Sequence, residues 1–284
     1  MTVALLIGAS VFLILSFDTP LPGDTFGFRG WGLLLGAALG TAGLLIAERV
    51  PSNPIGWLLL ASSVGVAAQE FATQYGNYGI YDSPGAVPAA DVAAWVPEWI
   101  WIPYMVAIAF YVPLLYPDGR LLSPRLRPVL VVGTLGAAIG TAAFALAPGE
   151  LPSSPDVRNP IGLEGAPWMA RLGDIAMYVF IVGLTVAIVS LGIRLRRSRG
   201  DERQQLKLLL LAFALLVAAF VLGVPYWTLA GGGTSSDTLE NVLVGTILEN
   251  VLVVSFVAIP VAIGFAILKY RLYDIDVVIK KTVV

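Results

Sequence analysis

The 284-residue sequence contains no cysteine and no histidine. Without cysteine the chain has no disulfide bond, no thiolate metal site and no cysteine nucleophile. Without histidine it lacks the side chain that most often serves as a general base or as a metal ligand. We therefore predict no metal site, no catalytic residue and no cofactor.

Charge is also scarce, because only 13% of the residues are Asp, Glu, Lys or Arg, whereas soluble domains carry about 25%. Apolar residues make up 57% of the chain and form long stretches between short polar connectors. About 20 residues of apolar helix cross the ~30 Å hydrocarbon layer of a bilayer. The pattern predicts an all-α, polytopic membrane protein with eight transmembrane helices, at Val3–Phe17, Trp31–Ala47, Ile55–Gln74, Trp99–Tyr116, Val129–Ala147, Ile175–Ile193, Leu206–Val224 and Thr246–Leu268.

The first of these stretches is the shortest and has two interpretations. A secretory signal peptide normally has a basic start and a cleavage site of small residues, and neither feature precedes Asp18. We therefore interpret residues 3–17 as a retained helix.

The few cations are distributed unevenly between the connectors. Fourteen of the 17 Lys and Arg residues lie in every second connector or in the C-terminal tail, and the other connectors hold only Arg29, Arg158 and Arg171. Because loops rich in Lys and Arg stay cytoplasmic, both termini are predicted to face the cytoplasm. The basic inner face suits contact with anionic headgroups of the lipid bilayer, and no basic soluble surface for nucleic acid is evident.

The chain is predicted to form a membrane domain over residues 1–268 and a cytoplasmic tail over residues 269–284. The outer connectors are rich in Gly, Pro and Ser and are too short for a separate extracellular domain, so any signal must be received by the helices or by these connectors. At the inner turns, Asn53–Pro54 and Ser123–Pro124 are typical of helix starts. Gly200 is typical of a left-handed helix end.

Small residues recur at four-residue spacing in two of the helices, at Gly32, Gly36 and Gly40 and again at Gly136 and Gly140. This spacing lets helices approach closely inside a bilayer. It indicates either a homodimer face or packing within one bundle. We favour packing within the bundle, because eight helices offer many internal neighbours.

Three carboxylates and a group of aromatic residues fall in the outer half of the predicted spans. Carboxylates in or near hydrocarbon usually face the bundle interior or a water-filled cavity, although a solvated position among the headgroups explains them equally well. The tryptophans also fit the aromatic belt expected at the membrane interface. We hypothesise an outer-facing ligand or sensing pocket formed by Glu70, Glu98, Trp99, Trp101, Tyr104 and Glu249.

Four inner segments carry a family resemblance, namely residues 49–57, 116–124, 201–207 and 269–282. Together they resemble the N-terminal membrane region of bacterial two-component sensor histidine kinases of an actinobacterial type. The resemblance covers nearly the whole chain, and its most specific element is Tyr-Arg-Leu-Tyr-Asp-Ile-Asp at 270–276.

The resemblance implies a sensory input module in the bacterial plasma membrane. Such a module passes a signal through its last helix to a cytoplasmic kinase core, and from there to a response regulator. The chain departs from this family in having no histidine to accept a phosphoryl group, so we expect that this chain itself is not an enzyme. The implied relay residues are Pro260, Tyr270, Arg271, Tyr273, Asp274 and Asp276.

The residues themselves give this relay a physical basis. Pro260 cannot donate a helical hydrogen bond and so permits a kink in the last helix. In the tail, apolar residues at helical spacing alternate with cations, which suits a short amphipathic segment at the membrane interface. A plain positive stop after the last helix is the simpler alternative.

Other function classes fit the residues less well. A transporter or channel normally has interrupted helices in corresponding halves, and this sequence has none, nor any paired charges near the middle of the spans. An intramembrane enzyme has no candidate catalytic group here. A membrane scaffold that binds partners through its basic inner face also remains an alternative.

The charge pattern predicts that Arg196 and Lys280 lie on the same, cytoplasmic side. Since the natural chain has no cysteine, Arg196→Cys and Lys280→Cys each introduce a single reactive thiol. A membrane-impermeant maleimide should label both thiols only after the cells are permeabilised. Labelling of the two positions from opposite sides would contradict the predicted topology.

Overall fold

The computed structural model describes residues 1–21, 29–229, 247–248 and 250–266. Its longer helices are α1 (Thr2–Leu15), α2 (Trp31–Arg49), α3 (Pro54–Asn77), α7 (Arg127–Ala145), α8 (Trp168–Arg197) and α9 (Gly200–Leu229). The shorter elements are η1 (Tyr78–Asp82), α4 (Ala90–Trp95), α5 (Pro97–Val106), η2 (Ala107–Tyr111), α6 (Val112–Leu115), η3 (Pro124–Leu126), β1 (Glu150–Leu151) and β2 (Ser154–Arg158). A further helix, Asn250–Ala266, is the last helix of the described chain.

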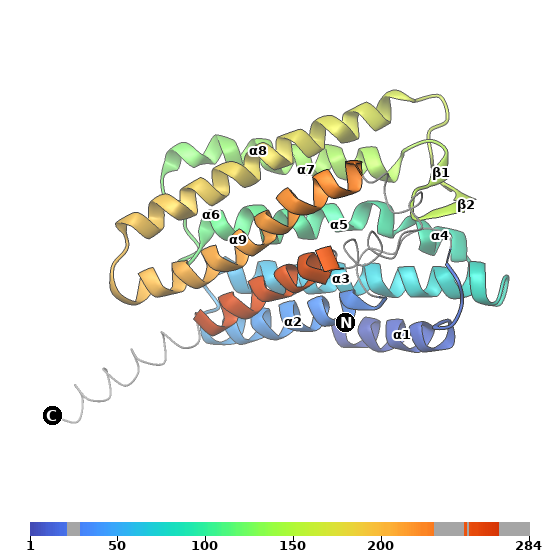
Figure 1. Ribbon diagram of the computed structural model, residues 1–284, viewed down its shortest axis with the longest axis horizontal. Helices are drawn as coiled ribbons and strands as arrows, with labels where there is room; N and C mark the ends of the chain where they lie inside the picture. Colours follow the sequence, from blue (N-terminus) through green and yellow to red (C-terminus); the bar gives the residue numbers. More distant parts are fainter. Residues whose placement is uncertain (22–28, 230–246, 249, 267–284) are drawn as a thin grey trace.

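The helices form one elongated bundle whose long axis they follow (Figure 1). α3 lies centrally and packs against α1, α2, α4 and α5, while α7 packs on α5 and α8, and α8 packs on α9. The structure is 77% helical, and the short β1–β2 hairpin is the only sheet in the described part of the chain. The predicted all-α architecture is therefore confirmed.

Among the described residues, five helices are long and apolar enough to cross a membrane: Trp31–Arg49, Pro54–Asp82, Ala90–Leu115, Pro124–Ala145 and Arg171–Arg197. α1, the apolar part of α9 and the last helix are shorter apolar helices within the described residues. Large apolar side chains also cover the outside of the bundle, among them Ile14, Leu135, Tyr178 and Val254. Such a surface exceeds what water-soluble monomers expose, and it gives the chain the character of a membrane protein.

The two ends of the bundle differ in charge. The α8–α9 connection lies at the left end in Figure 1, and the β1–β2 hairpin lies at the right end. α8 ends with Arg194, Arg196 and Arg197, and α9 follows with Arg203 and Lys207. The uneven distribution of cations along the sequence thus corresponds to a difference between the ends of the helices.

Polar contacts at the basic end of the bundle join the start of α3 to the turn that follows α6. Asn53 caps α3 by accepting a 3.0 Å hydrogen bond from the Ile55 N–H. Its Nδ2 donates at 2.9 Å to the Pro117 carbonyl, which lies beyond the end of α6. The buried Arg194 of α8 donates to the carbonyls of Tyr116 and Arg120, which lie with Pro117 in the turn that follows α6. This turn after α6 therefore ties α3, α6 and α8 together.

α2 and α3 approach closely because glycines occupy their crossing. A Cβ added to Gly56 would lie 2.8 Å from the Ala47 backbone nitrogen, and one added to Gly43 would lie 2.8 Å from the Leu60 nitrogen. Ser63 of α3 donates a 2.9 Å hydrogen bond to the Gly36 carbonyl of α2. This close approach maximises the packing that drives helix association in a bilayer.

A second glycine-lined contact joins α5, α7 and α8. The η2 segment presents the buried Phe110, whose ring lies against Gly133 of α7 and Gly183 of α8. Gly136 and Gly140 of α7 face Val179 and Ala176 of α8. The preferred interpretation of the glycine spacing, packing within one bundle, is confirmed at these positions. A homodimer stays a prediction.

Several element boundaries differ from the predicted ones. The fourth predicted helix begins with α5 at Pro97 rather than at Trp99, because proline is tolerated at the first position of a helix, and the short helix α4 precedes it. α8 and α9 extend beyond their apolar stretches to Arg197 and Leu229. The predicted helix starts at Asn53 and Ser123 are confirmed, and Gly200 is left-handed, with φ of 58°.

The α2–α3 crossing generates a stability prediction. Gly56→Ala should lower the free energy of unfolding by about 1–3 kcal/mol, because the added methyl group collides with the α2 backbone. Gly192→Ala is the matched control, since a Cβ there meets nothing within 4 Å. Thermal unfolding of both variants in detergent measures the difference. Equal unfolding temperatures would contradict the close backbone contact.

Candidate functional site

A cavity of about 1060 Å³ lies inside the bundle. Its lining residues come from α2, α3, α5, α8, α9, the last helix and the loop at Pro152–Ser154. One part of the wall is polar and includes Glu70, Gln74 and Glu98. The rest is apolar. A cavity with these two surfaces suits an amphipathic molecule.

Glu70 is buried on α3 and reaches the start of α2. Its carboxylate accepts a 2.8 Å hydrogen bond from Nε2 of Gln74, one turn further along α3. It also accepts from the N–H of Gly32, the second residue of α2. The N-cap of α2 is Gly30, which has no side chain to cap the helix, so Glu70 satisfies an N–H group that the helix itself leaves without a partner.

Gly32 leaves room for this carboxylate. A Cβ added to Gly32 would lie 2.3 Å from Oε2 of Glu70. Of the glycines spaced by four residues in α2, Gly32 therefore faces Glu70 of the cavity wall, whereas Gly36 and Gly40 lie in contacts between helices.

Glu98 lies buried in the first turn of α5, where the helix dipole favours a negative charge. Its carboxylate accepts a 3.0 Å hydrogen bond from the Ser153 N–H and a second bond from the Ser153 hydroxyl group. Glu98 thus ties the loop between β1 and β2 to the wall of the cavity.

Two predicted aromatic residues complete the polar wall. The hydroxyl group of Tyr104 donates a 2.7 Å hydrogen bond to Oε1 of Gln69, so α5 and α3 are joined beside Glu70. Trp101 lines the cavity and donates through its indole nitrogen to the Glu98 carbonyl at 3.0 Å. Both side chains are positioned by hydrogen bonds rather than by packing alone.

The cavity also reaches the last helix. Phe256 forms part of the wall and stacks on Trp31 at the start of α2, with ring centroids 6.4 Å apart. Pro260 follows one turn later and is buried. The cavity is therefore in contact with the helix that leads toward the C-terminal segment.

The remaining predicted residues lie elsewhere. Trp99 packs on Trp95, with ring centroids 5.3 Å apart, and is not among the residues that line the cavity. Glu249 and the relay residues Tyr270, Arg271, Tyr273, Asp274 and Asp276 lie outside the described residues. The structure thus brings together Glu70, Glu98, Trp101 and Tyr104 of the predicted group.

Sequence reasoning missed most of the wall. It did not assign Gln74, Arg29 or Ser153 to a site, and it gave no role to the apolar residues of α8 and α9 that form the larger surface. Gln74 follows Glu70 by one helical turn, and this spacing is a usable signal for a hydrogen-bonded pair. Apolar cavity residues carry no such signal, because they resemble every other residue of a membrane helix.

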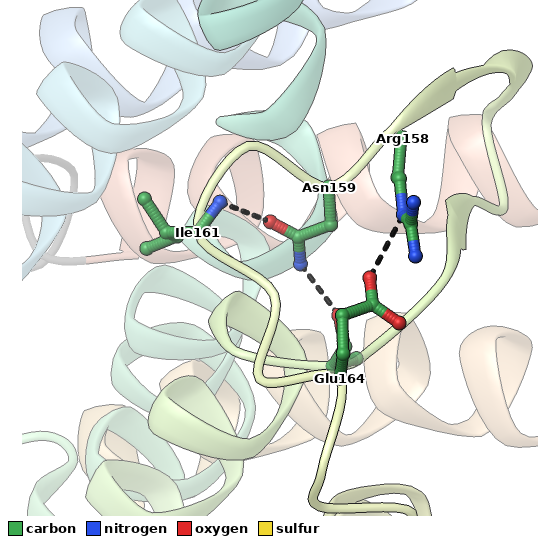
Figure 2. A network of polar contacts seen from close by, with 5 residues as sticks. Arg158, Asn159, Ile161 and Glu164 are labelled. Carbon is green, nitrogen blue, oxygen red and sulfur yellow. Dashed lines mark hydrogen bonds and ion pairs between the residues drawn. The ribbon is translucent and has the colours of Figure 1, made fainter.

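The connector beyond β2 is held by a network of polar contacts (Figure 2). Asn159 donates through Nδ2 to the Ala145 and Ala147 carbonyls at the end of α7, at 3.1 and 2.7 Å, and its Oδ1 accepts from the Ile161 N–H. Arg158 and Glu164 form an exposed ion pair at 2.9 Å. The hydrogen bond from Arg158, and then its charge, lower the pKa of Glu164 below its usual range.

Comparison of the chain with protein-family models, with curated protein sequences and with solved structures yields no match.

The ion pair in this connector generates a pH prediction. The pKa of Glu164 is lowered in the folded chain. The ion pair therefore stabilises the folded chain at pH values above the unfolded pKa, and this stabilisation is lost as the pH falls through the folded pKa. Arg158→Gln should raise the Glu164 pKa back toward its ordinary value. NMR titration of ¹³C-labelled glutamate carboxyl groups in detergent measures this shift.

Arg171→Gln serves as the control, because it removes an exposed cation that forms no ion pair within the described part of the chain. An unchanged Glu164 titration in the Arg158→Gln variant would contradict the pairing.

Proposed function

We propose that the chain is a membrane-embedded sensory input module. In this proposal eight helices cross the bacterial plasma membrane, both termini are cytoplasmic, and the last helix passes the signal to a cytoplasmic output such as a histidine kinase core. The sequence resemblance and the basic inner end of the bundle support this orientation, since cationic connectors remain cytoplasmic.

One observation carries the proposal: a single cavity has Glu70 and Glu98 on one wall and Phe256 of the last helix on another. A ligand in this cavity would contact the outer connector through Glu98 and the last helix through Phe256. Occupancy then changes the energy of one arrangement of the last helix relative to another, and this difference is what a sensor requires.

Pro260 gives the last helix a specific point at which to bend. Proline has no backbone N–H, so the helical hydrogen bond from residue 260 to the Phe256 carbonyl is absent. The weakened turn therefore begins at the residue that contacts the cavity. Below it, Gly264 approaches Ala42 of α2, with 3.3 Å between an added Cβ and the Ala42 Cβ. Beyond Pro260 the last helix therefore places a small residue, Gly264, in close contact with α2.

The proposal includes no catalytic activity for this chain. A carrier would also use an internal cavity, but binding sites of carriers lie near the bilayer midplane between repeated halves. The polar wall here lies at the end of the bundle that carries the β1–β2 hairpin. Uptake of a solute by reconstituted vesicles would favour the carrier over the sensor.

The bend at Pro260 generates a functional prediction. Residues 1–284 are joined to the kinase core of a histidine kinase of the resembled type, and autophosphorylation is measured in proteoliposomes. Pro260→Ala restores the missing hydrogen bond donor and should change the rate on the order of fivefold or more, with unchanged membrane insertion.

Gly192→Ala on α8 is the control, because its added methyl group contacts nothing within 4 Å. A Pro260→Ala protein with the unmodified rate would exclude the last helix as the moving part.

A further inference from the structure

The polar wall of the cavity carries two carboxylates that have no cationic partner among the described residues. Glu70 and Glu98 each accept hydrogen bonds from neutral donors, and no Lys or Arg nitrogen among the described residues lies within ion-pair distance of either carboxylate. A carboxylate has about four acceptor positions, so both retain capacity. A buried carboxylate that lacks a cationic partner is costly in a membrane interior.

Gln74 adds an independent acceptor. Its side chain lines the cavity and is only 2% exposed. Its Nε2 is committed to Glu70, which leaves Oε1 as an acceptor that receives no hydrogen bond from the described residues. A buried acceptor without a donor is energetically costly. The wall is therefore complementary to a group that carries both positive charge and N–H donors.

Arg29 also lines the cavity. Its terminal nitrogens donate to the Phe17 and Thr19 carbonyls and to the Ser16 hydroxyl group, so they hold the connection that follows α1. Its buried Nε has no acceptor among the described residues. Arg29 is the one cation among the described residues that line the cavity, and two carboxylates oppose it.

Part of the apolar wall is accessible to a ligand. Ile181 and Val189 of α8 and Val217 of α9 line the cavity and are 49%, 56% and 40% exposed. These side chains offer an apolar surface against which a hydrocarbon chain of a ligand can lie.

The size of the cavity agrees with such a ligand. Pockets for small molecules measure about 300–1000 Å³, and this cavity reaches about 1060 Å³. A small amine would fill only its polar end and leave the apolar wall in contact with nothing.

The geometry points to a single-chain alkylammonium amphiphile as the ligand, with its N–H-bearing head at Glu70, Gln74 and Glu98 and its chain between α8 and α9. This inference rests on the proposed sensory function and names the chemical class of its ligand. A trimethylammonium head carries the charge without the donors, and a carboxylate head carries the opposite charge. Both should bind more weakly.

The test uses the full 284-residue chain in lipid nanodiscs and a dodecylammonium probe that carries a diazirine in the middle of its chain. After irradiation, mass spectrometry should locate the adducts within residues 177–189 and 213–217. Competition by unlabelled dodecylammonium should require about tenfold lower concentrations than competition by dodecyltrimethylammonium, dodecanoate or butylammonium. Adducts confined to other segments, or equal competition by dodecanoate, would overturn the assignment.

Variants test the head position separately. Glu70→Gln and Gln74→Leu should each weaken competition about tenfold, whereas Glu164→Gln, the same chemical change outside the cavity, should leave it unchanged. Equal competition in all three variants would overturn the head position even if the adducts map as expected. The probe comparison on the unmodified chain needs no variant to fold.

These measurements involve no kinase output. A chain that binds alkylammonium but does not drive a fused kinase refutes the sensory proposal alone. A chain that drives the kinase but prefers dodecanoate refutes the ligand class alone.

Discussion

The start of a helix leaves backbone N–H groups without partners in that helix, and inside a membrane no bulk water replaces them. In this chain Glu70 supplies an acceptor for the Gly32 N–H of α2 from a neighbouring helix. This contact joins α3 to the first turn of α2, where Gly32 leaves room for the carboxylate and Gly30 has no capping side chain. Glu70 is also part of the polar wall of the cavity.

The cost of burying a carboxylate explains which part of the site is predictable from the sequence. A glutamate in or near hydrocarbon has few tolerable positions, so Glu70 and Glu98 indicate either an interior polar site or a solvated position among the headgroups. Both are buried in the structure, which favours the interior site. Tryptophans are less specific, because the membrane interface and the interior both suit them. Trp101 lines the cavity while Trp99 packs on Trp95, two residues of the same type only two positions apart. Their roles follow from the helix face, which depends on where α5 begins.

A short sequence motif predicts its own turn better than it predicts the helix or connector in which the turn lies. Asn-Pro-Ile-Gly occurs at 53–56 and at 159–162, and in both places the asparagine Oδ1 accepts from the isoleucine N–H two residues later. At Asn53 this turn opens a long helix, whereas at Asn159 it lies in a connector beside a short hairpin. The hairpin was not predicted, because its Pro- and Ser-rich sequence has no alternating pattern and is stabilised by contacts with Glu98 and the end of α7.

The described contacts of α3 differ in type from those that the last helix makes with the core. α3 is held at Asn53, Ser63 and Glu70 by directional hydrogen bonds to its neighbours, and it crosses α2 at backbone distance. The last helix contributes apolar side chains such as Leu252, Ile259 and Ile263 to the core, and apolar contacts have no strict direction. Under the proposed function, a ligand in the cavity would act on the last helix at Phe256, and Pro260 lies between this point of contact and the C-terminal segment.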